Sequence, residues 1–171
     1  MKQIIRILFI GLLFGAFSNS SWARNFRIEV LVFHQDSPTS EIFDQAESHL
    51  QWPSIINPNF VENIYLQKAY YSLSANYAYK PVYYKSWIQS VGPNRISKGV
   101  PIKKDSLLNG FVRVQRGHYV HLLVDLEYAP DSVYTENPVI YRINEKRKLK
   151  LNEIHYFDHP KFGVIATVRP L

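Results

Sequence analysis

The stretch "FVRVQRGHYVHLLVDLEY", residues 111–128, contains two segments in which apolar and polar residues alternate on either side of an Arg-Gly pair. Alternation with a period of two is typical of strands that bury one face, and a glycine between two such segments is typical of a hairpin loop. The alternating apolar residues are Val112 and Val114 in the first segment and Val120, Leu122, Val124 and Leu126 in the second. We therefore expect an antiparallel hairpin.

The register of this hairpin follows from the requirement that both apolar sets lie on one face of the sheet. Pairing Val114 with Val120 meets this requirement and leaves residues 116–118 as the loop. The same register places Arg113 opposite His121 on the less apolar face. We therefore expect these two polar side chains to point to the same side of the sheet.

Four other segments have the composition of strands, and two have that of helices. Residues 26–33 are apolar on both faces, which predicts a strand at the centre of its sheet. The other strands are expected at 79–89, 138–143 and 162–168. Apolar residues recur at helical spacing within 63–75, and a second short helix is expected at 39–50.

These elements predict an α+β fold made of a single small domain. Its largely antiparallel sheet would have about five to six strands, with one or two helices packed on one face.

The N-terminal residues have the composition of a secretory signal peptide. Lys2 and Arg6 precede and flank an apolar stretch at 7–17, which is followed by small residues up to Ala23. That stretch is too short to span a bilayer, which requires about 20 residues. We expect a signal peptide at 1–23 and a domain at 24–171 that resides in the periplasm and meets the membrane only through the cleaved signal peptide.

Composition limits the classes of function. Removal of 1–23 would reduce the 171 residues to 148 and the 20 cationic side chains to 18, against 14 acidic ones, for a balance of +4. This weak positive charge suits an anionic partner such as a cell-wall polymer and does not predict nucleic-acid binding. The absence of cysteine excludes disulfides and a thiol nucleophile, and no phosphate loop or serine-nucleophile motif is present. We therefore expect no cofactor and no enzymatic activity.

Residues 155–160, "HYFDHP", permit two interpretations. His155, Asp158 and His159 could form the metal site of a wall hydrolase, because their spacing is similar to the H-x-x-E-H signature. That signature requires a helix, and Pro160 disfavours helical conformation in the preceding residue. The alternative is a turn in which Asp158 accepts backbone N–H bonds while Tyr156 and Phe157 pack into the core.

A run of cations directly precedes this motif, at Lys146, Arg147, Lys148 and Lys150. It could be a solvated strand end or turn. Alternatively, its guanidinium and ammonium groups could pair with carboxylates of a peptide stem or with phosphates, while exposed aromatic rings stack on sugars. The candidate rings are those of Tyr83, Trp87 and Tyr119.

Residues 145–168, "EKRKLKLNEIHYFDHPKFGVIATV", resemble the C-terminal signature of the CsiV family of periplasmic peptidoglycan-binding proteins. The matching positions are Glu145, Arg147, Lys148, Lys150, Glu153, His155, Tyr156, Asp158, His159, Pro160 and Gly163. Segments 26–35, 82–89 and 116–128 resemble two strands and the hairpin of the same family. Lys148 stands where the family has arginine, and the segment 36–60 is short compared with members that carry an insertion there.

The resemblance implies a non-enzymatic periplasmic factor that binds peptidoglycan or its precursor. It further implies support of cell-wall synthesis through a periplasmic lipoprotein activator of a class A penicillin-binding synthase. The alternatives are the metal-dependent hydrolase and an adaptor that binds only proteins. The ligand site is expected among Arg147, Lys148, Lys150, His155, Tyr156, Asp158, His159, Arg113, His121 and Trp87.

Overall fold

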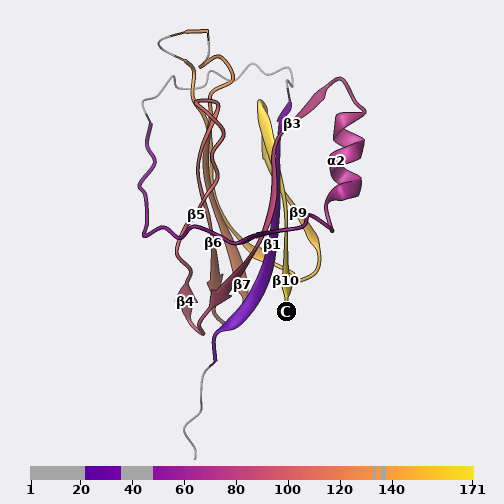
Figure 1. Ribbon diagram of the computed structural model, residues 1–171. Helices are drawn as coiled ribbons and strands as arrows, with labels where there is room; N and C mark the ends of the chain where they lie inside the picture. The colour runs from indigo at the N-terminus through magenta and orange to yellow at the C-terminus, as the bar shows by residue number, and fades with distance from the viewer. Residues whose placement is uncertain (1–21, 36–47, 133, 136–137) are drawn as a thin grey trace, which may run out of the picture.

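The computed structural model describes residues 22–35, 48–132, 134–135 and 138–171. Within these ranges the strands form two antiparallel sheets of five strands each (Figure 1). The order in the first sheet is β2 (Phe60–Val61), β3 (Tyr79–Val91), β1 (Arg24–Gln35), β10 (Phe162–Pro170) and β9 (Ile154–His159). The order in the second is β4 (Arg95–Ile96), β6 (Leu108–Arg116), β7 (Val120–Tyr128) and β8 (Tyr141–Leu149), with β5 (Val100–Pro101) also paired to β6.

Two of the expected elements fall largely outside the described residues. The expected signal peptide lies outside them apart from Trp22 and Ala23. The helix expected at 39–50 also lies outside them apart from its last three residues, which are not helical.

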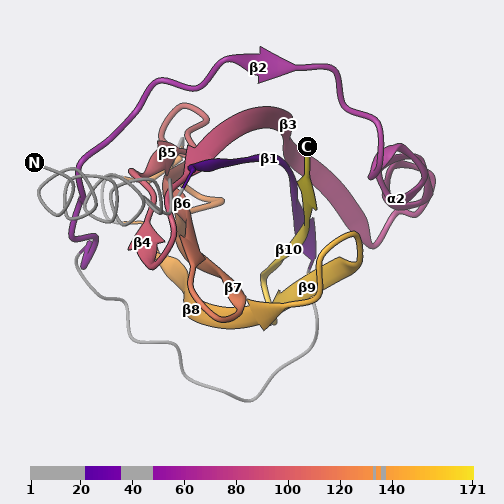
Figure 2. The same cartoon turned by 90° about the horizontal axis from the view of Figure 1, so that it is seen from below.

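The predicted α+β fold is wrong, because the chain is mostly β and has two sheets. The one helix in the described part of the chain, α2 (Gln67–Ser74), has no buried residue and cannot cover the apolar face of a sheet. Instead, the inner faces of the two sheets contribute to one hydrophobic core, around which Figure 2 shows the strands arranged. Alternation within a strand requires a cover for its apolar face but does not specify whether a helix or a second sheet provides it.

Strand β1 lies at the centre of the first sheet, as its composition predicted. It pairs antiparallel with β3 on one side and with β10 on the other. Ile28 points to the inner face, where it lies opposite Trp87 of β3 and Val168 of β10. Glu29 and Leu31 point to the outer face and are also fully buried. Burial on both faces explains why this strand is almost continuously apolar.

The predicted hairpin is formed by β6 and β7, but its register is shifted by two residues. The observed pairs are Arg113–Leu123, Val114–Leu122 and Gln115–His121. The loop comprises residues 117–119, in which Gly117 N donates to Tyr119 O at 3.0 Å. A shift of two residues keeps every side chain on the same face, so the requirement of a shared apolar face could not distinguish the two registers.

The helix predicted at 63–75 is present but begins later, at Gln67. The preceding turn is bound by Glu29, whose fully buried carboxylate accepts the backbone N–H groups of residues 64–66 at 3.0 to 3.2 Å. The hydroxyl of Tyr84 donates to the same carboxylate at 2.6 Å. Helix α2 has no side-chain cap of its own, and the first N–H groups of a helix have no partner within it. The glutamate of a strand far away in the sequence binds N–H groups at the start of α2 instead.

Helix α2 lies against the outer face of the first sheet, as Figures 1 and 2 show. The ring of Tyr70 stacks on that of Tyr84, with 5.2 Å between the ring centroids. Burial, together with the hydrogen bond to Glu29, raises the pKa of Tyr84, so its hydroxyl remains a donor at neutral pH. No helix among the described residues is long and apolar enough to cross a membrane.

We expect Glu29→Ala to lower the free energy of unfolding by about 3 kcal/mol or more, because several buried donors would lose their acceptor. Chemical denaturation followed by tryptophan fluorescence measures this change. The control is Glu62→Ala, which removes an exposed carboxylate from the neighbouring segment and should change stability by less than about 0.5 kcal/mol. Equal effects of the two substitutions would contradict the structural role of Glu29.

Candidate functional site

The HYFDHP motif forms strand β9 and the start of the loop that follows it, so the turn expected there is wrong. Strand β9 pairs antiparallel with β10, and Pro160 and Lys161 form the loop between them. A residue before proline avoids helical conformation and prefers an extended one. His159, the last residue of β9, has this extended conformation. Pro160 therefore correctly excluded a helix, but it did not distinguish a turn from a strand.

The three candidate metal ligands do not converge. Side chains alternate between faces in a strand, so His155 and His159 lie on the inner face of β9 and Asp158 on the outer face. The two histidines are separated by about 13 Å along the strand, whereas bonds from zinc to nitrogen are about 2 Å long. Among the described residues, no group of three His, Asp or Glu side chains is placed so that it could hold a metal ion.

Both imidazole rings contact the backbone instead. Nε2 of His155 lies 3.0 Å from the carbonyl oxygen of Lys150. Nδ1 of His159 accepts the N–H of Lys161 at 3.1 Å, across the loop between β9 and β10. These contacts join β9 to the chain before it and to the loop after it. The two histidines therefore stabilise the β9–β10 hairpin and the turn that precedes it.

Tyr156 and Asp158 form a hydrogen-bond network with Gln35 on the outer face of the first sheet. Nε2 of Gln35 donates to Oδ1 of Asp158 at 2.9 Å and to the carbonyl oxygen of His159 at 2.7 Å. The hydroxyl of Tyr156 donates to Oδ1 of Asp158 at 2.5 Å. Burial, and then this bond, raise the pKa of Tyr156 to about 12. The carboxylate of Asp158 thus connects side chains of β1 and β9, in place of the backbone N–H bonds expected for it.

The ring of Tyr156 packs on the sheet surface above a glycine. It stacks with the ring of Phe33 at a centroid distance of 6.0 Å, and a Cβ added to Gly163 would lie 2.5 Å from Phe33 and 2.7 Å from Tyr156. Only glycine leaves room for both rings. Tyr156 is 40% exposed, so its expected place in the core is wrong, whereas Phe157 is fully buried as expected.

Arg147 joins the two sheets where β8 approaches β9. Its side chain leaves the inner face of β8 and bonds the carboxylate of Glu145 at 2.6 and 2.7 Å. It also donates to the main-chain oxygen of Tyr156 and lies 4.7 Å from the centre of the Phe157 ring. These contacts occupy most of the guanidinium donors, so the first role of Arg147 is to link the sheets.

Lys148 points the other way, to the outer face of the second sheet. There it lies beside His121 of β7, and Arg113 of β6 is on the same face. Lys146 also points outward, and Tyr119 lies in the loop at this end of the hairpin. We name Arg113, Tyr119, His121, Lys146 and Lys148 the basic outer face. The structure thus brings together three of the predicted site residues and separates them from Arg147.

Lysine and tyrosine are the accessible groups of the basic outer face. Nζ of Lys148 lies 3.1 Å from the centroid of the Tyr119 ring, which is 49% exposed. Lys146 and Lys148 form no ion pair within the described residues. The carboxylate in the next row of this face, that of Asp125, is bound by Arg142 through two bonds of 2.9 Å, which raises the pKa of Arg142. Both lysines are therefore available to an anionic ligand.

The remaining members of the basic outer face are partly buried. Nε of Arg113 donates to the carbonyl oxygen of Ser97 at 2.9 Å, which fixes the side chain along the sheet. Nδ1 of His121 is buried and has no hydrogen-bond partner among the described residues. These two residues support the surface more than they project from it.

Three other candidate residues lie elsewhere. Trp87 is fully buried in the core opposite Ile28, so the expected exposure of its ring is wrong. Tyr83 is half-buried, and burial raises its pKa to about 12. Lys150 is exposed beyond the end of β8, where Nζ lies 3.7 Å from the carboxylate of Glu153.

Two pockets at the opposite end of β7 are lined by residues that the sequence did not single out. One contains Glu127, and the other contains His34, Lys80 and Lys104. These residues come from four separate segments and match no motif. Only a correct pairing of β1 with β3 and of β6 with β7 would have placed the residues of each pocket together.

The two neighbouring cations of β8 are expected to differ in their effect on stability. Arg147→Gln should lower the free energy of unfolding by about 1–3 kcal/mol, because the Glu145 carboxylate and the Tyr156 carbonyl lose a charged donor. Lys146→Gln, which removes the same charge from the outer face, should change it by less than about 0.5 kcal/mol. Urea denaturation of both variants tests this difference, and a stable Arg147→Gln protein would refute the linking role.

Comparison with known proteins gave one match. No curated protein and no solved structure matched the chain. A family model described as "Peptidoglycan-binding protein, CsiV" matches residues 61–171, which is more than half of the chain and includes α2, β3 to β10, the basic outer face and the HYFDHP strand. On this match, the chain belongs to the CsiV family of peptidoglycan-binding proteins.

Proposed function

We propose that this protein binds peptidoglycan through its basic outer face. The observation that carries the proposal is the contact between Lys148 and the exposed ring of Tyr119, beside the unpaired Lys146, on a chain of this family. An exposed aromatic ring offers a flat apolar surface to a sugar, and ammonium groups beside it attract carboxylates. Peptidoglycan presents both groups, as sugar rings along the glycan and carboxylates on the peptide stems.

The supporting residues make this surface rigid. Arg113 is bound to the backbone at Ser97, and β7 is paired on both sides by β6 and β8. A ligand that binds here would therefore order few side chains, which lowers the entropic cost of binding. Lys148 supplies a single ammonium charge. Such a charge suits attraction to a flexible anionic polymer better than bidentate hydrogen bonding to one carboxylate.

We further propose that the protein is a non-enzymatic periplasmic factor acting with a lipoprotein activator of a class A penicillin-binding synthase. The expected signal peptide supports export, and the family resemblance supports the partner. A purely protein-binding adaptor is the second candidate. It is favoured by exposed apolar side chains in the segment before α2, namely Ile56, Phe60, Ile64 and Tyr65.

Purified sacculi test the first proposal. The protein should sediment with sacculi at low salt, and Lys146→Gln combined with Lys148→Gln should weaken binding about threefold to tenfold, with a further loss on Tyr119→Ala. The matched control combines Lys68→Gln with Lys80→Gln, two exposed lysines of α2 and of β3 in the first sheet, and should bind like the unaltered protein.

Two results would refute the proposal. Failure of the unaltered protein to sediment at low salt would remove peptidoglycan as its ligand. Equal losses in the Lys146/Lys148 variant and the control variant would show attraction by net charge alone and remove the basic outer face as the site.

A further inference from the structure

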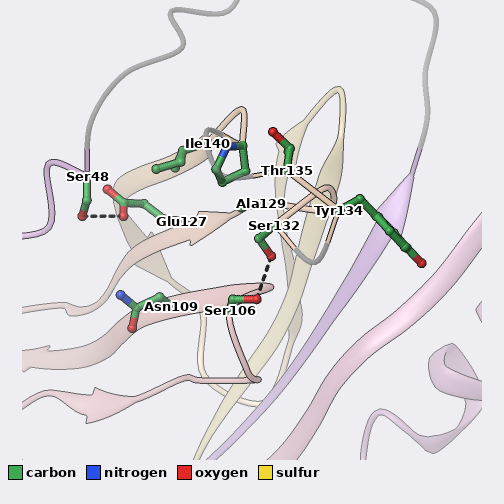
Figure 3. A pocket seen from close by; sticks show the side chains of 10 residues that line it. Ser48, Ser106, Asn109, Glu127, Ala129, Ser132, Tyr134, Thr135 and Ile140 are labelled. Carbon is green, nitrogen blue, oxygen red and sulfur yellow. Dashed lines mark hydrogen bonds between the residues drawn. The ribbon is translucent and has the colours of Figure 1, made fainter.

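The pocket beside Glu127, which we name the Glu127 pocket, lies on the outer face of the second sheet (Figure 3). Leu126 points to the core, so alternation along β7 directs Glu127 outward. The strand register places Asn109 of β6 directly opposite Glu127 on that face. The volume of the pocket is about 670 Å³, and small-molecule sites typically have roughly 300–1,000 Å³. The pocket is therefore large enough for a small ligand, and two neighbouring strands supply its polar groups.

Glu127 contributes a carboxylate whose hydrogen-bonding capacity is used only in part. The residue is 6% exposed, and its carboxylate accepts the hydroxyl of Ser48 at 2.7 Å and the N–H of His49 at 2.8 Å. A carboxylate can accept about four hydrogen bonds, so acceptor sites are left for a ligand. The two bonds also hold the carboxylate in place, which lowers the entropic cost of binding a further donor.

The other polar groups of the Glu127 pocket are neutral and can both donate and accept. The amide of Asn109 makes no hydrogen bond to another residue in the described part of the chain, and it has donors on nitrogen and acceptor sites on oxygen. Figure 3 shows the hydroxyls of Ser106 and Ser132, which are 2.9 Å apart. One hydroxyl hydrogen is used between them, so the pair retains a donor. The pocket thus presents a carboxylate together with an uncharged set of donors and acceptors.

The charges around the Glu127 pocket favour a neutral ligand. Arg142 of β8 lies opposite Glu127, and its guanidinium binds Asp125 through two bonds of 2.9 Å. These bonds, together with the charges of Asp125 and Glu127, raise the pKa of Arg142. The charge of Glu127 is therefore partly offset, which weakens its attraction for an ammonium group, while the carboxylate still repels an anion. A neutral ligand with hydroxyl donors avoids both disadvantages.

Apolar side chains complete the walls of the Glu127 pocket. Ala129, Pro138 and Ile140 line it beside the polar groups. A pyranose ring has hydroxyl groups around its rim, which both donate and accept hydrogen bonds, and C–H groups on its faces, which pack on apolar surface. The mixture of apolar walls with a few polar groups is typical of sites that fix the orientation of such a ligand.

We propose that the Glu127 pocket binds a neutral sugar unit, with the carboxylate of Glu127 and the amide of Asn109 hydrogen-bonded to its hydroxyl or acetamido groups. The identity of the sugar rests on the proposed function, because the glycan of peptidoglycan consists of N-acetylated amino sugars. The Glu127 pocket is a second contact with the polymer, separate from the basic outer face. It recognises the glycan chain, whereas the lysines of the basic outer face attract the charged peptide stems.

An NMR titration of the isotope-labelled protein with chitotriose, a neutral oligomer of N-acetylglucosamine, tests the proposal. The backbone amide signals of Glu127 and Ala129 should shift and saturate at millimolar concentration. Asn109→Ala should weaken the affinity measured from these signals about tenfold, and so should Glu127→Gln, since each removes hydrogen bonds to the sugar. The signals report on the pocket itself, so sugar that binds elsewhere on the surface does not enter the measurement.

Asn144→Ala is the matched control, because it removes an exposed amide of β8 that lies outside the Glu127 pocket. This variant should bind chitotriose like the unaltered protein. Glu127→Gln keeps one side-chain oxygen for residues 48–49, and its urea denaturation shows whether it remains folded. If it does not, Asn109→Ala decides alone, since its side chain has no hydrogen bond in the described part of the chain to lose.

Three results would overturn the proposal. The first is the absence of shifts at Glu127 and Ala129 with millimolar chitotriose, and the second is equal affinity of the Asn109→Ala and Asn144→Ala variants. The third is a response of these signals to ethylamine but not to chitotriose, which would assign the pocket to an ammonium group. Sedimentation with sacculi separates these failures from failure of the proposed function, because chitotriose has no carboxylate for the lysines of the basic outer face.

Discussion

In the described part of the chain, the apolar inner faces of the two sheets cover each other, and the single helix there buries none of its residues. Their inner side chains form one core, with Ile28 and Val168 from the first sheet and Val124 from the second among them. Burial of each such side chain contributes about 1.5–3 kcal/mol, and with no cysteine in the chain no disulfide adds to this. Because this packing uses the inner faces, the candidate binding residues and the pockets lie on the outer faces, at the ends of the sheets and where the two sheets meet.

Two buried glutamates hold residues 48–66, which cross the outside of this core before α2. Glu127 of the second sheet binds residue 49 through its backbone N–H, and Glu29 of the first sheet binds residues 64–66 in the same way. Between these points β2 pairs with β3. A carboxylate supplies several acceptors at one position, so a single side chain can satisfy an irregular stretch of backbone that has no strand or helix partner.

The alternation of β8 divides its cations between structure and surface. Arg147 and Glu145 point inward and pair at the junction with β9, while Lys146 and Lys148 point outward. Cations adjacent in sequence thus lie on opposite sides of a sheet, and those on the outer side are the exposed ones. The same alternation places the two histidines and the aspartate of β9 on opposite faces and leaves them with separate partners.

The sequence alone determined the features that depend on local periodicity. It indicated the central strand, the hairpin and its faces, a helix near residue 70 and, through the 145–168 signature, the family. It also indicated Arg113, His121 and Lys148 as candidates, and these share one face because a shift of two residues preserves the face. The tertiary structure decided what covers each face, the hairpin register, the burial of Trp87, the linking role of Arg147 and the placement of His34, Lys80 and Lys104 in one pocket and of Glu127 in another. The physical reason is that periodicity reports only that a face is buried, whereas the packing partner and the neighbours of each side chain depend on contacts between segments far apart in the chain.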